Sequence, residues 1–180
     1  MNMQRYNLAL IPVTYQLELI KIADQFKHGG EIDYLLGNTS LPHITLAQFY
    51  LDDITTLEKI WDNVSQLKQN KPQRLTLQLK GLNCYFDSKQ NDFVWLQLLP
   101  ESSIDLVSLH HEIINILKDY AITSLNKSLE NYEPHLTLAH TTNLIYVDEC
   151  EQYQIALTDQ FYIGLGESDE IGQLTRLYKS

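Results

Sequence analysis

The hexapeptide Pro42-His43-Ile44-Thr45-Leu46-Ala47 recurs, with a single substitution, as Pro134-His135-Leu136-Thr137-Leu138-Ala139. Both copies are typical of β-strands. Within each copy the histidine and the threonine are two positions apart, so a regular strand places both side chains on one face and the alternating aliphatic side chains on the other. If the two copies face each other, they form a site with two proton carriers and two hydroxyl groups.

Similar secondary structure is predicted before each hexapeptide. Hydrophobic periodicity indicates a strand over 5–13, a helix over 15–27 and a loop over 31–41 ahead of the first copy. Ahead of the second copy it indicates a strand over 93–99, a helix over 103–120 and another loop. A unit used twice can pack about a pseudo-two-fold axis, which we expect to bring the two His-Thr strands side by side.

The rest of the chain predicts one helix and further strands. The run Thr55-Thr56-Leu57-Glu58 matches a capping box at the start of the helix. The 74–80 segment alternates as a strand, and a polar turn at 87–92 links it to the 93–99 strand in a hairpin. Two more strands are expected around 160–165 and 173–178. Because no linker or low-complexity tract interrupts the chain, we expect residues 1–180 to form a single domain of two intertwined lobes.

The charge balance bears on the partners of the protein. Acidic residues number 23 and basic residues 13 among the 180, and the net charge is −10. Proteins that bind long nucleic acid usually carry a basic stripe, so we expect a small nucleotide or short oligonucleotide instead. The sequence shows no membrane span and no signal peptide, and we expect a cytoplasmic monomer. Cys84 and Cys150 lack metal-binding spacing and are expected to stay reduced.

Two His-x-Thr motifs in a duplicated strand-helix chain resemble the 2H phosphoesterase superfamily, which includes the 2'-5' RNA ligase-like proteins and cyclic nucleotide phosphodiesterases. The segments 6–14, 81–82 and 93–96 are also similar to this family, most of all to the branch related to the central domain of the kinase-anchoring protein AKAP7. The resemblance implies an α+β fold that is bilobal, with two antiparallel sheets forming a central cleft and helices outside. It also implies metal-independent chemistry, without a cofactor, at a 2',3'-cyclic phosphate or a 2',5'-phosphodiester.

We assign four residues to this chemistry. Histidine, with an ordinary pKa near 6.5, can act as general acid or general base near neutrality, and His43 and His135 are the predicted catalytic pair. The hydroxyls of Thr45 and Thr137 are predicted to bind the phosphate oxygens. Which histidine is the base stays open at this stage.

The other histidines and several aromatic residues are secondary candidates. His28, His110 and His111 are expected to be structural or solvated. His140 lies an odd number of positions from His135, so alternation predicts that it points away from the catalytic pair. Aromatic rings that flank the predicted cleft could stack on a base, and the candidates for substrate binding are Phe49, Tyr85 and Tyr132.

Three alternatives stay open. The first is a metal site, although two histidines supply fewer ligands than the three that a catalytic zinc normally takes. The second is a non-catalytic nucleotide-binding module, and a structural interaction domain is a weaker variant of it. The third is RNA 2',5'-ligase activity, because ligation and hydrolysis use the same groups. The substrate is also open among a cyclic mononucleotide, RNA with a cyclic phosphate end, a 2',5'-oligoadenylate and an ADP-ribose derivative.

Overall fold

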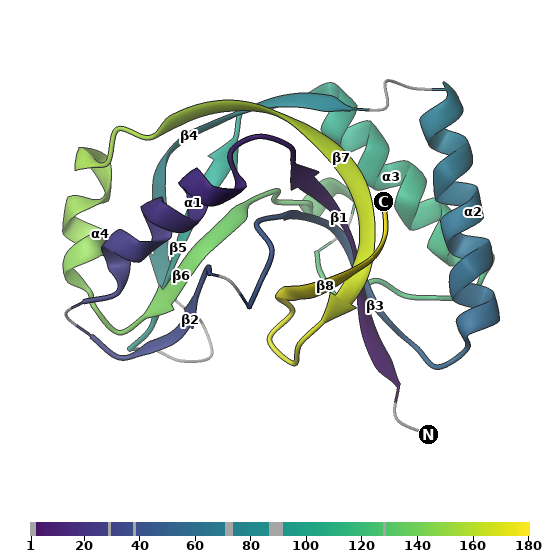
Figure 1. Ribbon diagram of the computed structural model, residues 1–180, viewed down its shortest axis with the longest axis horizontal. Helices are drawn as coiled ribbons and strands as arrows, with labels where there is room; N and C mark the ends of the chain where they lie inside the picture. The colour runs from purple at the N-terminus through teal and green to yellow at the C-terminus, as the bar shows by residue number, and fades with distance from the viewer. Residues whose placement is uncertain (1–2, 29, 38, 71–73, 87–91, 128) are drawn as a thin grey trace.

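The computed structural model describes residues 3–28, 30–37, 39–70, 74–86, 92–127 and 129–180, with the backbone alone for residues 68–70. Eight strands and four α-helices lie within these residues (Figure 1). The strands are β1 (Gln4–Pro12), β2 (Ile32–Leu35), β3 (Ile44–Leu51), β4 (Leu75–Phe86), β5 (Val94–Pro100), β6 (Leu136–Thr141), β7 (Ala156–Ser168) and β8 (Leu174–Lys179). The helices are α1 (Gln16–Ala23), α2 (Ile54–Asn70), α3 (Ile104–Asp119) and α4 (Ile145–Glu149), with 3₁₀ turns at Asp24–Phe26, Leu129–Asn131 and Cys150–Gln152.

The mixed α+β fold predicted from the sequence is confirmed, and the differences are local. The predicted ranges match β1, β5, β8 and α3 closely, whereas β4 and β7 are longer than predicted. The loop expected over 31–41 contains β2, and the short helix α4 was not predicted. The turn predicted at 87–92 lies, except for Asp92, outside the described residues.

The start of α2 differs from the predicted capping box. Asp53, rather than Thr55, caps the helix, because its carboxylate accepts from the backbone N–H groups of Thr55 at 3.0 Å and Thr56 at 3.1 Å. The Thr56 hydroxyl also donates to this carboxylate at 2.6 Å. A carboxylate in this position satisfies N–H groups of the first turn that have no partner within the helix.

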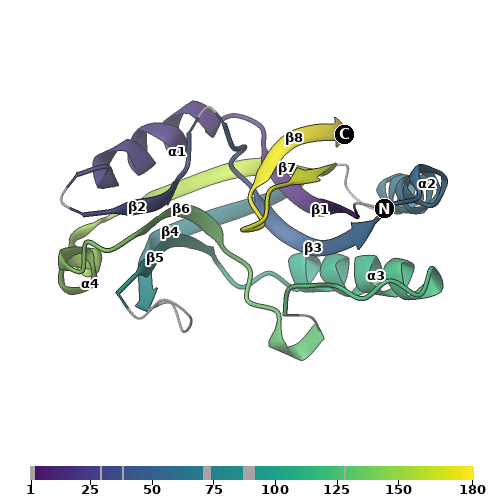
Figure 2. The ribbon, with the colours of Figure 1, turned by 90° about the horizontal axis from the view of Figure 1, so that it is seen from below.

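The strands form one antiparallel sheet in the order β2-β6-β5-β4-β7-β1-β3, and β8 pairs with β7. The two predicted sheets are therefore joined, and β4 and β7 make the connection because each is long enough to serve both halves. Residues 156–161 of β7 pair with β4, and residues 161–167 pair with β1. Figure 2 shows the resulting division, with β2, β6, β5 and β4 on one side and β1, β3, β7 and β8 on the other.

The two hexapeptide strands are not neighbours in this sheet. β3 and β6 belong to different halves, and β5, β4, β7 and β1 separate them in the hydrogen-bonded order. The two strands nevertheless approach each other in space, so the expectation that they lie close together holds, although no hydrogen-bonded ladder joins them. The repeated unit is still exchanged between halves, since α1 packs against β6 and α3 packs against β3.

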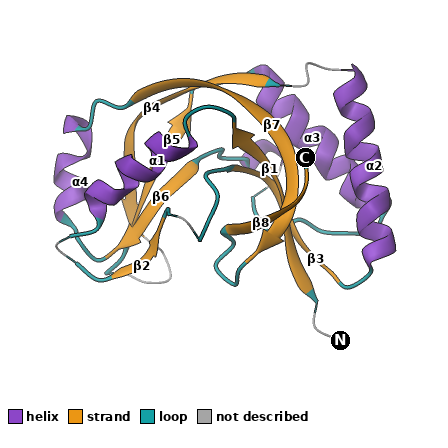
Figure 3. Cartoon of the chain, in the orientation of Figure 1, coloured by secondary structure: helices purple, strands orange, loops and turns teal. Residues whose placement is uncertain are grey.

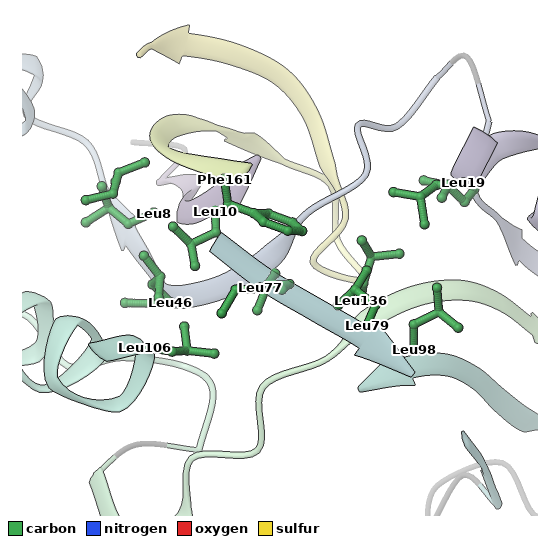
Figure 4. Packing of buried hydrophobic residues seen from close by; sticks show 14 of the residues in the cluster. Leu8, Leu10, Leu19, Leu46, Leu77, Leu79, Leu98, Leu106, Leu136 and Phe161 are labelled. Carbon is green, nitrogen blue, oxygen red and sulfur yellow. The ribbon is translucent and has the colours of Figure 1, made fainter. Parts of the chain in front are cut away.

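The helices flank the sheet, and a shared core joins the two halves. Figure 3 shows α1 and α4 beside the half that contains β6, and α2 and α3 beside the half that contains β3. Figure 4 shows aliphatic side chains from strands and helices of both halves that belong, together with Phe161, to one buried cluster. The aliphatic residues of the hexapeptides, Ile44, Leu46, Leu136 and Leu138, are fully buried as predicted. Burial of each such side chain stabilises the fold by about 1.5–3 kcal/mol, so the same strands that present the polar residues also fix their backbone.

Across the described ranges, every helix is too short or too polar to cross a bilayer.

Candidate functional site

A cavity of about 670 Å³ brings the two hexapeptides together. Its volume is in the range typical of small-molecule sites. His43, Thr45, His135 and Thr137 all line it, so the four residues assigned from the sequence face one space. The other lining residues come from β3, β4, β5, the 126–133 segment and the β7–β8 turn: Gln48, Asn83, Tyr85, Trp95, Gln97, Leu99, Asn126, Lys127, Tyr132, Glu133, Ile171, Gly172 and Gln173.

The backbone just before β3 holds the imidazole of His43. Its Nδ1 lies 2.7 Å from the carbonyl oxygen of Leu41. A carbonyl can only accept, so Nδ1 carries a hydrogen and Nε2 is left to exchange protons. His43 as a whole is only 7% exposed. Burial lowers the pKa of His43 to about 4, against the opposing effect of the Leu41 carbonyl, and the neighbouring His135 lowers it further.

The imidazole of His135 is held in the same way but is more exposed. Its Nδ1 lies 2.9 Å from the carbonyl oxygen of Glu133, so Nε2 is again the available nitrogen. Desolvation lowers the pKa of His135, whereas the Glu133 carbonyl and carboxylate raise it and Lys127 lowers it. The ammonium of Lys127 lies 2.7 Å from the Glu133 carboxylate, so this acidic group and basic group largely offset each other beside the ring.

A β-bulge follows the threonine in each hexapeptide. Adjacent residues of β1 pair with the residues on either side of Leu46, so Leu46 is the extra residue of the first bulge. Adjacent residues of β5 likewise pair with the residues on either side of Leu138. The two copies therefore share a β-bulge at the equivalent position as well as their sequence.

The bulges correct the prediction for His140. A bulge resets the alternation of a strand, so the residue three positions after each threonine returns to the threonine's face. Gln48 follows Thr45 in this way and lines the cavity. His140 follows Thr137 and lies directly opposite Trp95 of β5, with the two rings stacked at 3.9 Å. His140 thus lies on the cavity side of β6, buried behind Trp95.

The structure also identifies a partner of Thr45 that the sequence did not reveal. Asn7 of β1 is fully buried, and its Nδ2 donates to the Thr45 hydroxyl oxygen at 3.2 Å. With that lone pair occupied, the hydroxyl hydrogen of Thr45 is available to a ligand in the cavity. Asn7 can be identified only from the register of β1 and β3. Ala9 pairs with Thr45, and Asn7 lies two positions before Ala9, opposite Gln48.

The three aromatic candidates have different positions. Phe49 is fully buried in the core, so its assignment to substrate binding is wrong: after the bulge at Leu46, alternation turns it inward. Tyr85 and Tyr132 line the cavity as expected. Sequence reasoning missed Trp95, which is opposite Tyr85 in the β4–β5 pair and lines the cavity beside it.

Gly172, in the β7–β8 turn, shapes another part of the cavity lining. Its φ of 95° lies in the left-handed region that favours glycine. A side chain there would lie 2.7 Å from the Arg5 guanidinium and 2.8 Å from the Gln48 amide. Gln48 accepts from Arg5 at 2.6 Å and donates to the Gly172 carbonyl at 2.5 Å, so this corner of the cavity is held by hydrogen bonds.

The chemical character of the cavity follows from its side chains. It presents two imidazoles, two hydroxyls, several amides and two aromatic rings on one wall. Such a set can move protons, donate hydrogen bonds to an anion and stack on a planar ring. Within the described ranges no cluster of three His, Cys, Asp or Glu side chains has the arrangement of a metal site, and Cys84 and Cys150 carry free thiols.

Comparison with known proteins agrees with the motifs. The sequence model of the 2'-5' RNA ligase superfamily matches residues 19–161. The chain therefore belongs to the 2'-5' RNA ligase superfamily, the group of 2H phosphoesterases that its two His-x-Thr motifs resemble. No curated protein sequence matches the chain.

Solved structures share the fold at low sequence identity. E. coli LigT complexed with 3'-AMP has a TM-score of 0.62 at 13% identity, covering 99% of this chain and 96% of that one. The PDE domain of MHV ns2 has a TM-score of 0.55 at 13% identity, covering 95% and 99%. Usb1 of Kluyveromyces marxianus has a TM-score of 0.54 at 9% identity, covering 97% of each chain. These likenesses establish the fold.

Proposed function

We propose that the protein is a metal-independent phosphodiesterase that hydrolyses a 2',3'-cyclic phosphate or a 2',5'-phosphodiester of a nucleotide or short RNA. The observation that supports this most is the pair of imidazoles in one cavity, each bonded through Nδ1 to the carbonyl two residues before it. Both rings therefore offer Nε2 to the same space. Such a pair can serve the two sides of an in-line displacement at phosphorus.

The environments of the two histidines support different roles. His43 is buried and its pKa is about 4, so the ring is neutral near pH 7 and suits a general base. His135 is more exposed than His43, so desolvation disfavours its protonated form less, and it is the better general acid. His43 Nε2 takes a proton from water as the water oxygen bonds to phosphorus. The bond from phosphorus to a ribose oxygen breaks, and His135 gives its Nε2 proton to that oxygen, leaving a phosphomonoester and a hydroxyl.

The threonines and the aromatic wall serve binding in this proposal. The Thr45 and Thr137 hydroxyls donate to the non-bridging phosphate oxygens, where charge concentrates in the transition state. The paired rings of Tyr85 and Trp95 stack on the nucleobase, a contact worth about 1–3 kcal/mol per base. The amide of Gln97, on the same face of β5 as Trp95, also lines the cavity, and its Nε2 donates to the Tyr85 hydroxyl at 3.4 Å. Solved structures of E. coli LigT hold 3'-AMP, ATP and NADP+, which supports a small nucleotide ligand here as well.

The test is a substrate panel assayed in EDTA. It contains a 2',3'-cyclic mononucleotide, an RNA with a 2',3'-cyclic phosphate end and a 2',5'-linked oligoadenylate. We expect turnover of at least one, and losses of about 10²–10⁴-fold in kcat for His43→Ala and His135→Ala separately. His111→Ala is the matched control, because His111 is a histidine of α3 outside the cavity.

Each alternative has its own outcome in this experiment. Binding of the nucleotide without turnover would favour a non-catalytic binding module. Loss of activity in EDTA would favour a metal site. Joining of RNA ends without net hydrolysis would favour 2',5'-ligase activity. Unchanged turnover in either histidine variant would refute the acid-base mechanism.

A further inference from the structure

A third histidine, His110 of α3, lies behind the cavity and contacts both hexapeptide regions. It is fully buried and does not line the cavity. Its Nδ1 lies 2.8 Å from the carbonyl oxygen of Leu46, and its Nε2 accepts from the backbone N–H of Leu129 at 2.9 Å. A buried side chain with both ring nitrogens bonded to backbone of distant segments connects those segments.

The hydrogen bonds define the proton on this ring. The Leu46 carbonyl can only accept, so Nδ1 carries the hydrogen, and the Leu129 N–H can only donate, so Nε2 does not. The ring is therefore neutral, and burial, which lowers the pKa of His110, favours that form. His110 differs from the two motif histidines, whose Nε2 atoms face the cavity.

The two bonded positions are structurally special. Leu46 is the extra residue of the bulge and follows Thr45 directly. Leu129 has a φ of 57°, a left-handed conformation that is costly for a residue other than glycine and needs support from its surroundings. It begins the 3₁₀ turn that leads to His135. His110 thus bonds to the backbone directly after the first His-Thr pair and, six residues before His135, to the segment that leads to the second pair.

Tyr132 adds a second connection between the same segments. Its ring stacks on His110 with centroids 3.8 Å apart and planes 1° apart. Its hydroxyl donates to the backbone carbonyl of Thr45 at 2.8 Å. The segment that carries His135 is therefore held to β3 at Leu46 through His110 and at Thr45 through Tyr132.

We propose that His110 is a positioning residue that sets the separation of His43 and His135, the two proton carriers of the proposed reaction. The inference rests on the proposed function for its catalytic consequence. Proton transfer to both sides of one phosphorus requires the two imidazoles at a fixed distance, and a displacement of about 1 Å can cost about 100-fold in rate. We call the contacts of His110 and Tyr132 with Leu46, Leu129 and Thr45 the His110 junction. The proposed nucleotide contacts of Tyr85 and Trp95 come from β4 and β5 and do not depend on this junction.

The experiment replaces the imidazole of His110 with another planar ring that cannot form its hydrogen bonds. His110→Phe keeps a planar ring against Tyr132 and removes both hydrogen bonds. We expect kcat to fall about 10–100-fold with KM changed less than about threefold. His110→Asn keeps an N–H near the position of Nδ1, so it can still bond to Leu46, and we expect a smaller loss. The matched control is His111→Phe, the next residue on α3, which should resemble the unmodified protein.

A second measurement does not depend on activity. Titration of the His43 and His135 imidazoles by NMR reports their surroundings directly. If the Leu129–His135 segment moves outward in His110→Phe, His135 is less desolvated and its pKa rises toward 6.5, whereas His111→Phe leaves the titration unchanged. Should the unmodified protein turn over no substrate in the panel, the proposed function fails and these titrations alone decide the role of His110.

Both measurements require that the variants fold. If His110→Phe does not fold, His110→Asn and Tyr132→Phe, which removes only the hydroxyl bond to Thr45, are used in its place. The inference is overturned if a folded variant of the junction has the kcat of the unmodified protein and unchanged titrations of His43 and His135.

Discussion

The burial of His43 makes a prediction about stability in acid. The ordinary pKa of histidine is about 6.5 and that of His43 in the folded protein is about 4. Between these values the unfolded chain binds a proton that the folded protein does not, so the contribution to stability is complete above pH 6.5 and is lost as the pH falls. With 1.36 kcal/mol for each pKa unit, about 3 kcal/mol of the free energy of unfolding is lost by pH 4. That is a large part of the 5–15 kcal/mol typical of a domain.

The assay is urea unfolding of the unmodified protein and of His43→Gln at pH 7 and pH 4. Carboxylates also titrate over this range, but they do so in both proteins, so the difference between the two free energies of unfolding isolates His43. We expect this difference to fall by about 3 kcal/mol from pH 7 to pH 4. A difference that stays constant within about 1 kcal/mol, or an NMR titration of His43 near pH 6.5 in the folded protein, would refute the assignment of a buried neutral base.

Three further predictions concern the cavity. The pH profile of kcat/KM is expected to be bell-shaped with its alkaline limb below pH 6.5, since the acid His135 has a lowered pKa; a limb above pH 7.5 would contradict the assigned roles. Glu133→Gln removes a charge that raises the pKa of His135, so the alkaline limb should move to lower pH, whereas the exposed neighbour Glu130→Gln should leave the limb in place. Trp95→Leu should raise KM by about 5–100-fold through lost stacking, and Phe49→Leu should instead lower the free energy of unfolding by about 1–3 kcal/mol with KM unchanged. Equal KM values for these last two variants would contradict the stacking role.

The repeated sequence of the hexapeptides predicted the four polar residues that the cavity brings together. The alternation of polar and aliphatic residues correctly indicated that His43, Thr45, His135 and Thr137 face one space while the aliphatic residues are buried, and the structure bears this out. The shared face within each copy needed only the period of a strand, which is a local property of the chain. The meeting of the two copies was inferred instead from the repeated strand-helix unit. The predictions of β1, β5, β8 and α3 succeeded for the same reason, whereas the short elements β2 and α4 were missed.

Counting along the strand failed where the backbone departs from regularity. The predicted direction of His140 assumed unbroken alternation past the threonine. Phe49 was chosen only because it flanks the predicted cleft, and the bulge at Leu46 turns its side chain into the core. Each bulge shifts that alternation by one residue. A bulge is a property of two paired strands, and the sequence of β3 or β6 alone does not show which partner residues will be opposite.

The sequence by itself indicated the family, the fold class and four of the polar residues that line the cavity. The tertiary structure alone decided how the two halves meet, through β4 and β7, and which distant side chains support the motifs. Asn7 beneath Thr45, Trp95 beside Tyr85, and His110 between Leu46 and Leu129 all depend on pairings between segments far apart in the chain. Periodicity is set by neighbouring residues, whereas strand order and register are set by the packing of the whole chain, so these residues became visible only in three dimensions.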